Sequence, residues 1–391
     1  MIRYLTAGES HGKGLLIIID GVPANLKIRE EQINSVLRKR QIGFGRGKRQ
    51  DIERDFAEVI SGIRGGKTIG SPLAFFIKNK DYENWKDILS IEPFFSHVTE
   101  FNVPRPGHAD LAGGIKYHHY DFRNVLERSS ARETAARIIA GIVSKIFLNE
   151  FNMDILGYVI NIGGISIKEK EMDLKKIKRK IEILGEKYRI NLRCPDKSAA
   201  DKMIKKIKKA INEGDTLGGI IKIITTRMPV GLGSYTQWDK KLDARIARAL
   251  VSIQAFKGVE FGAGFKYADF SGSKIHDQIF YSKKKGIFRK TNNAGGFEGG
   301  MTNGEPIVIK AVMKPISTVR KGLYSINIRT KKKVKTIYER SDVCAVPSAS
   351  LIAENVVAIE IANAFMEKFG ADEIGEIKAN YKKYLSYVKK Y

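Results

Sequence analysis

The sequence predicts an α+β fold, in which antiparallel sheets are packed against helices. Strand-like runs occur in pairs separated by glycine turns, as in EVISGIRGGKTIGSPLAFFI (58–77). Helical patterns are grouped between these pairs and do not alternate with single strands, which disfavours a regular parallel βαβ sheet. No repeat of roughly 20–50 residues and no low-complexity linker interrupts the chain, so a single domain is expected over residues 1–391.

The first half of the chain is expected to contain mainly strands and one helix. A strand, a glycine-rich turn and a second strand, LLIIIDGVP, occupy about the first 25 residues, and Asp-Gly and Pro23 end the second strand. Apolar side chains at Ile33, Val36 and Leu37 have the spacing of one helix face. The elements expected after the first strand pair are a helix at 29–40, a glycine- and arginine-rich loop at 40–50, two strands at 58–77 and mostly loop at 79–124.

A second helix is expected to begin near Ser129 or Ser130. Either serine can cap the helix, and Glu133 stands three residues after Ser130, as in a capping box. The elements expected further on are lysine-rich amphipathic helices within 168–213, strands within 218–231, a helix at 240–253, a loop flanked by strands at 291–318 and a long helix from about Pro347 to Phe369.

Charge is the unusual property of the composition. The 69 lysine and arginine residues exceed the 43 aspartate and glutamate residues, which gives a formal net charge of +26. Such an excess attracts anions, whether nucleic acid, anionic membrane or small phosphorylated and carboxylated molecules. The lysine-rich helices of 168–213 are most simply solvated faces, so charge by itself does not choose the partner.

The cysteines and the hydropathy pattern indicate the compartment. Cys194 and Cys344 are far apart and form no CxxC pair, so neither a disulfide framework nor a zinc ribbon is expected. The N-terminus lacks a basic region followed by an apolar one, and no window approaches the ~18–20 uninterrupted apolar residues of a membrane helix. We expect a soluble cytoplasmic protein without a membrane partner.

The glycine-rich stretch TAGESHGKG (6–14) first suggests a phosphate-binding loop. A P-loop needs four residues between its first glycine and the Gly-Lys pair, followed by Ser or Thr. Only three residues separate Gly8 from Gly12, and Gly14 stands where the hydroxyl should be. A nucleotide loop is therefore disfavoured. An ordinary strand-connecting turn explains the glycines, but it does not explain the imidazole of His11.

Two of the six histidines lie in glycine-rich turns, His11 in GESHG and His108 in RPGHAD. Imidazole titrates near neutral pH and can act as a proton donor or acceptor. Taken singly, each of these histidines is more often a structural residue than a catalytic one. No HExxH or similar ligand spacing occurs, so no metal site is expected.

Arginines are concentrated in loops and at helix starts, whereas lysines cover the helices of 168–213. The guanidinium fork suits carboxylate and phosphate groups, which favours a site for a small polyanion. RNA binding is the rival explanation, but the loops lack interleaved stacking aromatics and no RNP or KH pattern appears. The arginines concerned are Arg38, Arg40, Arg46, Arg49, Arg105, Arg123, Arg128, Arg132 and Arg137.

Eight segments, which span nearly the whole chain, resemble in their order the signature segments of the chorismate synthase family. A match of this length and order is far more specific than one short motif. The segments are GESHG (8–12), RQIGFGRG (40–47), RPGHADLAGGIKY (105–117), NVLERSSARETAAR (124–137), LDARIARALVSIQAFKGVEFGAGF (242–265), TNNAGGFEGGMTNGEPIV (291–308), KPIST (314–318) and ERSDVCAVP (339–347).

This resemblance implies a fold, a reaction and a cofactor. The fold of the family is a β-α-β sandwich of antiparallel sheets with surrounding helices, usually assembled as a homotetramer. Its enzymes are lyases that convert 5-enolpyruvylshikimate 3-phosphate to chorismate by anti 1,4-elimination of phosphate, the last common step of the shikimate pathway to the aromatic amino acids. Reduced FMN is required although no net redox change occurs, with NADPH as a candidate source of reducing electrons.

The resemblance also implies roles for four residues. His11 corresponds to the histidine that protonates the departing phosphate, and His108 to the one that stabilises or protonates the reduced flavin near N1 and the C2 carbonyl. Asp342 corresponds to the aspartate that helps N5 of the flavin take a proton from the substrate, with Ser10 as a relay.

Further positions match binding residues of the family. Binding of substrate or NADP is implied for Arg40 and Arg46, and contact with anionic groups of the substrate for Arg49 and Arg132. Flavin contacts are implied for Arg128, Ser129, Ser130, Gln254, Ala255, Gly299, Lys314, Pro315, Ile316, Ser317, Thr318 and Arg340.

Three segments depart from the family pattern. VRKGL follows KPIST, SASLIAENVVAIEIA follows AVP, and SYTQWD (234–239) lacks histidines that are common there. These changes concern local packing and subunit contacts more than chemistry. Two other classes stay open: a flavin-dependent oxidoreductase, which would share an FMN site, and a nucleic-acid-binding protein, which only the net charge favours.

Overall fold

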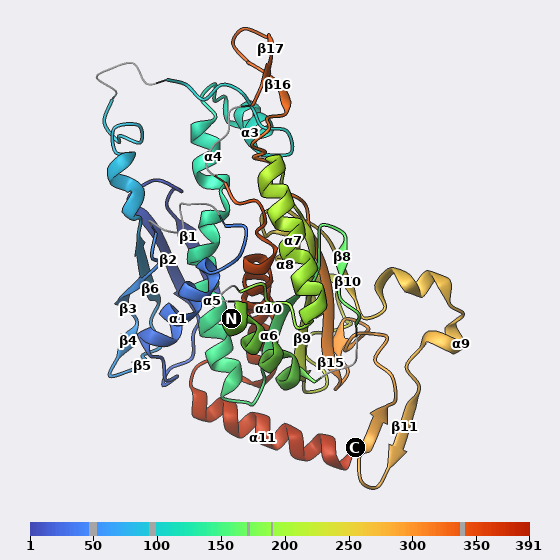
Figure 1. Cartoon of the computed structure of the whole chain (residues 1–391). Helices are drawn as coiled ribbons and strands as arrows, with labels where there is room; N and C mark the ends of the chain where they lie inside the picture. The colour runs from blue at the N-terminus through green and yellow to red at the C-terminus, as the bar shows by residue number, and fades with distance from the viewer. Residues whose placement is uncertain (47–52, 94–98, 170–172, 189–190, 337–340) are drawn as a thin grey trace.

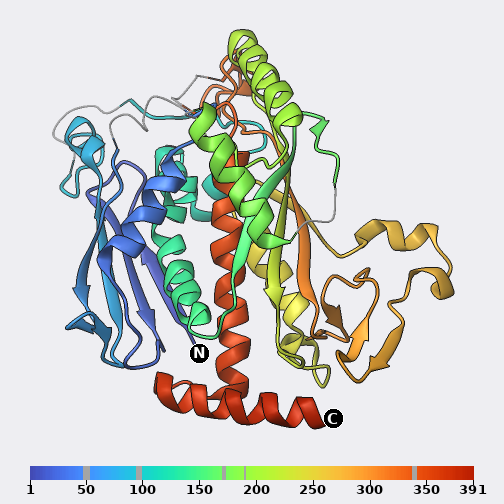
Figure 2. The ribbon, with the colours of Figure 1, turned by 60° about the horizontal axis from the view of Figure 1, so that its bottom comes forward.

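Two antiparallel sheets enclose a layer of helices, so that the chain forms a β-α-β sandwich (Figures 1 and 2). The computed structural model describes residues 1–46, 53–93, 99–169, 173–188, 191–336 and 341–391. One hydrophobic cluster, with members from Ile2 to Ile377, includes residues of both sheets and of the helices between them. The predicted α+β class and the sandwich implied by the resemblance are both confirmed.

The first sheet is formed by the N-terminal segment, in the strand order β1–β2–β6–β3. Burial alternates along β2, because Ile17 and Ile19 are fully buried whereas Ile18 between them is exposed. This period of two is that of a sheet with one face on the core. The strands are β1 (Arg3–Ala7), β2 (Gly14–Asp20), β3 (Ala57–Ser61) and β6 (Leu73–Lys78), and the small hairpin β4 (Ile63–Arg64) and β5 (Lys67–Thr68) lies between β3 and β6 in the chain.

The second sheet has five strands in the order β10–β15–β9–β7–β8. Both faces of β7 are buried, because Val159 belongs to the central cluster whereas Leu156 and Tyr158 belong to a second cluster formed with α6. This sheet is therefore covered on both sides near β7. The elements are β7 (Ile155–Ile162), β8 (Ile165–Ser166), β9 (Gly219–Arg227), β10 (Phe256–Phe261), β15 (Pro306–Met313) and α6 (Leu174–Tyr188).

The helices α5 (Thr134–Asn149) and α10 (Val346–Phe369) lie side by side between the sheets (Figure 2). α5 contacts the first sheet, mainly β2, and α10 contacts β7 and β9 of the second. The two helices approach closely at Gly141, where a Cβ atom would lie 2.3 Å from the carbonyl oxygen of Asn355. Only glycine permits this separation. α1 (Glu30–Gln41) and α8 (Leu242–Val251) complete the inner packing.

The remaining elements lie around this sandwich, and the β11–β12 hairpin with α9 projects from one side of it (Figures 1 and 2). They are the helices α3 (Asp110–Tyr117), α4 (Arg123–Ser129), α7 (Lys197–Glu213), α9 (Gly272–Ile275) and α11 (Ile374–Lys390), the 3-10 turns η1 (Lys80–Asn84), η2 (Ala131–Glu133), η3 (Trp238–Lys240) and η4 (Gly264–Asp269), and the hairpins β11 (Ile279–Ser282) with β12 (Gly286–Arg289), β13 (Phe297–Glu298) with β14 (Met301–Thr302), and β16 (Tyr324–Ile326) with β17 (Lys333–Lys335).

Most predicted elements are present, but several differ from the prediction or were not expected. The stretch expected to be mostly loop at 79–124 contains α3 and the start of α4, and α11 was not expected at all. The helix expected from Ser129 or Ser130 is broken: Ser130 is extended and its hydroxyl caps η2 by accepting from the backbone N–H of Arg132. No capping box forms, because the carboxylate of Glu133 instead accepts from Thr6 and Arg137.

α10 is the one helix, among the residues that the structure describes, with the length and apolar composition of a membrane span. In the fold, 94% of its most apolar window is buried inside the protein. A helix that is apolar on all sides is expected in such a central position, because sheets and helices surround it.

Candidate functional site

A cavity of about 420 Å³ lies where the loop after β1, the α4–η2 junction, the end of β15 and the start of α10 converge. Sixteen of the residues with a role implied by the resemblance line it. They are Ser10, His11, Arg40, Arg46, His108, Ser129, Ser130, Arg132, Gln254, Ala255, Lys314, Pro315, Ile316, Ser317, Thr318 and Asp342. Segments far apart in the sequence thus contribute to one site.

Two other residues with an implied flavin contact, Arg128 and Gly299, are not in this cavity wall. Arg128 is exposed and donates to the carbonyl oxygens of Thr6 and Gly8, which ties α4 to the end of β1. Gly299 lies in the turn between β13 and β14, away from the cavity lining. Arg49 and Arg340 lie outside the described residues.

The GESHG loop is fixed by a tight turn at Gly8 and by the side chain of Asn79. Gly8 has a φ of +105°, and a Cβ atom there would lie 2.1 Å from the carbonyl oxygen of Gly14. This glycine is therefore required for closure of the turn rather than for the approach of a ligand. The amide of Asn79, at the end of β6, lies within hydrogen-bonding distance of three loop carbonyls, at 3.1, 3.2 and 2.8 Å.

His11 is bound on one side by a carboxylate and stacked on the other against an aromatic ring. Its Nδ1 lies 2.9 Å from Oε1 of Glu127, and its backbone N–H donates to Oε2 of the same residue at 2.7 Å. The ring is stacked on Trp85 with centroids 4.2 Å apart. Burial raises the pKa of Glu127, but the hydrogen bonds and charge of His11 outweigh it and hold this pKa below its ordinary value.

His108 has a similar partner within its own turn. Its Nδ1 lies 2.6 Å from Oδ1 of Asp110, the first residue of α3. Arg105 also donates to Asp110, at 2.8 and 3.0 Å, and to the hydroxyl of Thr318 at 3.1 Å. Burial opposes ionisation of Asp110, but hydrogen bonds from His108 and Arg105 prevail and lower its pKa strongly.

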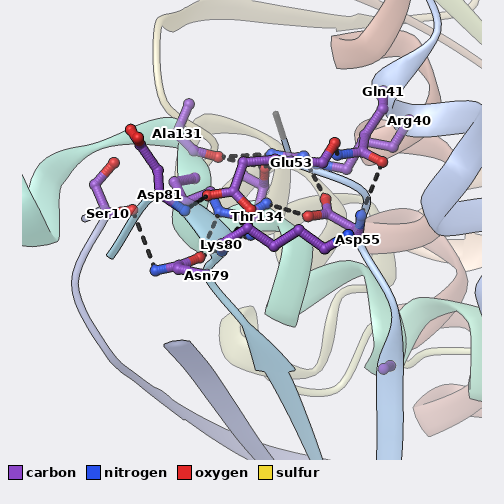
Figure 3. A network of polar contacts seen from close by, with 12 residues as sticks. Ser10, Arg40, Gln41, Glu53, Asp55, Asn79, Lys80, Asp81, Ala131 and Thr134 are labelled. Atoms are coloured by element: carbon purple, nitrogen blue, oxygen red, sulfur yellow. Dashed lines mark hydrogen bonds and ion pairs between the residues drawn. The ribbon is translucent and has the colours of Figure 1, made fainter. Parts of the chain in front are cut away.

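Arg40 and Arg132, which line the cavity, also belong to a buried network of polar contacts, in which Figure 3 labels Arg40, Asp55 and Asn79. Asp55 accepts from Nη1 of Arg132 at 2.5 Å and from Nη1 of Arg40 at 3.4 Å. Arg40 also donates to Thr134, and Arg132 to the amide oxygen of Asn79 at 2.8 Å. Burial, only partly offset by Asp55, lowers the pKa of Arg40 to about 10. Most of these donors are therefore already engaged in holding the loops together.

Two buried polar atoms on the cavity wall have no hydrogen-bond partner among the described residues. They are Nε of Arg46 and the amide oxygen of Gln254. The Nη1 atom of Arg46 is 2.8 Å from the carboxylate of Asp342, so one face of its guanidinium is neutralised. Buried polar atoms in proteins are nearly always satisfied, so one donor and one acceptor here are suited to a ligand.

The segment 314–318 forms the wall next to Gln254. Ala255 has a φ of +70°, and its carbonyl accepts from the backbone N–H of Lys314 at 2.9 Å. The ammonium group of Lys314 donates to the carbonyl of Gly107, next to His108. Burial, together with the charge of Lys257, lowers the pKa of Lys314. A strained backbone that persists at a cavity wall is frequently part of a binding site.

Sequence reasoning missed the carboxylates that hold the two histidines. Asp110 stands two positions after His108 in RPGHAD. Glu127 lies in the ERSSARE segment, whose serines were assigned flavin contacts. Acidic residues in otherwise basic motifs were the available signal. Trp85 and Asn79 lie in a stretch expected to be loop and carried no signal. Within the described ranges, no group of three or more His, Cys, Asp or Glu side chains could hold a metal ion.

The fold and the cavity define an α+β sandwich protein whose site combines two carboxylate-bound histidines with buried and half-buried cations. This combination is suited to proton transfer on a small polyanion.

Comparison with known proteins identifies the family. The family model described as chorismate synthase matches residues 2–366. The chorismate synthases of Geotalea uraniireducens (strain Rf4) and Listeria innocua (serovar 6a) are 51% and 50% identical to this chain over its full length and theirs. A solved structure titled "Crystal Structure of Chorismate Synthase" is similar with a TM-score of 0.79 and 41% identity, covering 100% of this chain and 99% of that one. The chain belongs to the chorismate synthase family, and this membership supports chorismate synthase activity and the general class of lyases.

Proposed function

We propose that this protein eliminates phosphate from 5-enolpyruvylshikimate 3-phosphate in an anti 1,4 sense, yielding chorismate. The observation that carries the proposal is that His11 and His108 both line one cavity, together with Arg46 and Lys314. A substrate with one phosphate and two carboxylates needs cations around it, and a phosphate leaves more easily when it is protonated or paired with cations. Family membership supports the same reaction.

Reduced FMN is the proposed cofactor, and the two unsatisfied atoms of the wall fit it. The buried amide oxygen of Gln254 can accept from a ring N–H, and Nε of Arg46 can donate to a carbonyl or phosphate oxygen. When bound, reduced FMN would supply an electron-rich ring that stabilises electron deficiency in the substrate as the C–O bond breaks. The residues proposed to hold it are Ser129, Ser130, Gln254, Ala255 and 314–318.

The side chains of the protein then bind anions and move protons. His11 is proposed to donate a proton to the departing phosphate, and His108 to stabilise the bound flavin. Asp342, paired with Arg46, and Ser10, whose hydroxyl donates to Ser130 at 3.1 Å, line the same cavity and are proposed to assist removal of the substrate proton. The lysines of α6 and α7 have no part in this mechanism.

The assembly and compartment are proposed from the family and from the surface. Cys194 and Cys344 are buried free thiols, as suits a reducing cytoplasm. Leu5 and Ile60 are exposed on the outer face of the first sheet, where a second copy could cover them in a homotetramer. Sedimentation analysis tests the tetramer, and a monomer at micromolar concentration would contradict it.

The central experiment is anaerobic turnover with dithionite-reduced FMN. We expect phosphate and chorismate to appear in equal amounts with reduced FMN and neither to appear with oxidised FMN. No release under reducing conditions would contradict the proposal. The same assay with NADPH in place of dithionite tests whether the protein reduces its own flavin. Consumption of one NADPH per product would indicate a flavin-dependent oxidoreductase instead.

The nucleic-acid alternative has a separate test. Retention of RNA at physiological salt, together with no effect of FMN on the melting temperature, would favour that alternative. We expect the opposite pattern, in which FMN raises the melting temperature by mass action and RNA is released as salt screens the lysines.

A further inference from the structure

Glu127 is almost completely buried and directs both carboxylate oxygens at one residue. It is 4% exposed and lies in α4, 116 residues along the chain from His11. Oε1 meets the imidazole Nδ1 at 2.9 Å, and Oε2 accepts from the backbone N–H at 2.7 Å. A carboxylate that contacts the ring and the backbone of the same residue fixes the side chain and the chain together.

The ionisation state of Glu127 decides which nitrogen of His11 carries a hydrogen. An ionised carboxylate only accepts hydrogen bonds. The lowered pKa of Glu127 keeps it ionised at neutral pH. Nδ1 of His11 must therefore donate, so a neutral His11 carries its hydrogen on Nδ1 and any proton exchanged with a ligand passes through Nε2.

Other contacts restrain the ring and the carboxylate from further directions. Trp85 stacks on the imidazole, and the indole N–H donates to Asp81 at 3.2 Å. The guanidinium of Arg123, one helical turn before Glu127, lies over the Trp85 ring at 4.9 Å and 3.7 Å from Oε1 of Glu127. The ring is thus oriented by a packed arrangement and not by one hydrogen bond.

We propose that Glu127 is a positioning residue that holds His11 in the Nδ1–H tautomer with Nε2 as the proton-transferring atom. The inference deepens the proposed function, since it rests on His11 acting on the departing phosphate. During transfer the imidazolium gives up its Nε2 proton, and the electron pair of that N–H bond stays on Nε2. The proton goes to a phosphate oxygen, and the neutral Nδ1–H ring stays bound to Glu127.

A purely structural role is the competing explanation. The main-chain carbonyl of Glu127 accepts from the backbone N–H of Ser10 at 2.9 Å, so α4 anchors the loop even without the carboxylate. Glu127→Gln keeps the size of the side chain and this backbone bond. Its amide, however, has one donor and one acceptor, whereas His11 directs two donors at it, the backbone N–H and Nδ1–H. The variant therefore favours the Nε2–H tautomer of His11, because the Nδ1–H tautomer would set an amide N–H against an N–H of His11.

The direct test is histidine-selective ¹⁵N labelling and NMR of the ring nitrogens in the full-length protein, with His11→Gln to assign the signal. In wild-type protein at a pH where His11 is neutral, we expect Nδ1 to show the protonated shift. In Glu127→Gln we expect a shift to the Nε2–H form or a mixture. The same tautomer in both proteins would overturn the proposal, and this readout does not depend on the reaction.

Kinetics supply the second readout. We expect Glu127→Gln to lower kcat by roughly 10- to 1000-fold with KM changed far less, and Glu127→Asp to recover part of the loss because it restores a carboxylate. Glu305→Gln is the matched control, since Glu305 is also buried and ion-paired, with Arg227 at 3.2 Å, but lies outside the cavity lining. It should keep wild-type kinetics.

The outcomes separate the two hypotheses. If the wild-type protein turns over substrate and Glu127→Gln has the same kcat, the positioning role is overturned. Equal losses in the Gln and Asp variants, with a lowered melting temperature and an unchanged tautomer, would indicate a structural role and would also overturn it. If wild-type protein releases no phosphate, the proposed function fails. The tautomer of His11 is decided by the NMR measurement alone.

Discussion

The two cavity histidines have carboxylate partners in different electrostatic settings. Asp110 is shared between His108 and Arg105, whose Nε is 2.8 Å away, whereas Glu127 has its cation, Arg123, at 3.7 Å. Glu127 therefore interacts mainly with His11, whereas Asp110 divides its interaction between His108 and Arg105. This difference suits the proposed roles, in which His11 carries and releases a proton and His108 stabilises the bound flavin.

The proposed roles predict the effect of removing each imidazole. His11→Ala and His108→Ala should each lower turnover by roughly 10- to 1000-fold, the range for a lost acid–base or electrostatic group. Phosphate release under anaerobic conditions measures this. His276→Ala is the control, because His276 is exposed and outside the cavity lining. Wild-type turnover in either cavity variant would contradict its role.

The lowered pKa of Asp110 predicts a loss of stability in acid. A carboxyl group with a folded-state pKa below its unfolded value of 3.8 stabilises the protein above that pH, and the contribution is lost as pH falls further through the folded pKa. Asp110→Asn should destabilise by about 3 kcal/mol at pH 7, because it breaks a buried pair. The difference from wild type should shrink below about pH 4. Urea unfolding of both proteins at pH 7 and below about pH 4 measures this. A difference in the free energy of unfolding that does not change with pH would contradict it.

At the scale of elements, the crossing of α5 and α10 sets the thickness of the helical layer. Gly141 lies where α5 meets the backbone of α10 at Asn355. Each of these helices contacts a different sheet, so their separation also sets the distance between the two sheets. The cavity at one end of the layer depends on that distance, since α4, η2 and the start of α10 form its walls.

Gly141→Ala tests whether close packing outweighs helix propensity. In an exposed helix interior the change would stabilise by about 1 kcal/mol. Here the added methyl group would meet the Asn355 carbonyl at 2.3 Å, so we expect net destabilisation of about 1–3 kcal/mol from overpacking. Gly185→Ala in α6, where nothing lies within 4 Å of the added atom, is the control and should be neutral or stabilising. Calorimetry that shows a stabilised Gly141→Ala would refute this account.

How far the sequence predicts an element depends on how local its cause is. α10 was expected from about Pro347 to Phe369 and is found at Val346–Phe369, because a long apolar run with proline at its start is a local signal. α11 was missed, since its lysines and tyrosines leave a weaker apolar face. His11 and His108 were found from motifs. Glu127 was not, because its pairing with His11 joins residues that only the fold brings together.

At the scale of the whole molecule, the positive charge is divided between two kinds of place. Lysines cover the exposed faces of α6 and α7, whereas arginines and Lys314 line or support the cavity. Charges in solvent are screened within about 10 Å at 0.1 M salt, but charges beside a buried ligand are not. The number of charges removed should therefore matter less than their location.

A triple substitution on α7 tests this division. Lys202, Lys205 and Lys208 are exposed, and changing all three to Gln should alter KM by no more than about twofold because of screening. Solubility should change more than turnover. Lys314→Gln removes only one charge, but it should weaken substrate or flavin binding more than the triple variant does. A large fall in turnover in the triple variant would show that the lysine face takes part in catalysis.

The position of α10 has a consequence for how the protein is made. This helix is synthesised after every strand of the two sheets, yet it covers the inner face of the second sheet. Asn363 within it accepts from the backbone N–H of Ile2, 361 positions earlier. The second sheet cannot bury its inner apolar face while the ribosome still holds α10. Apolar surface of the nascent chain therefore stays exposed until α10 has been synthesised. A chain truncated before residue 346 would aggregate or be degraded rather than form a smaller folded protein.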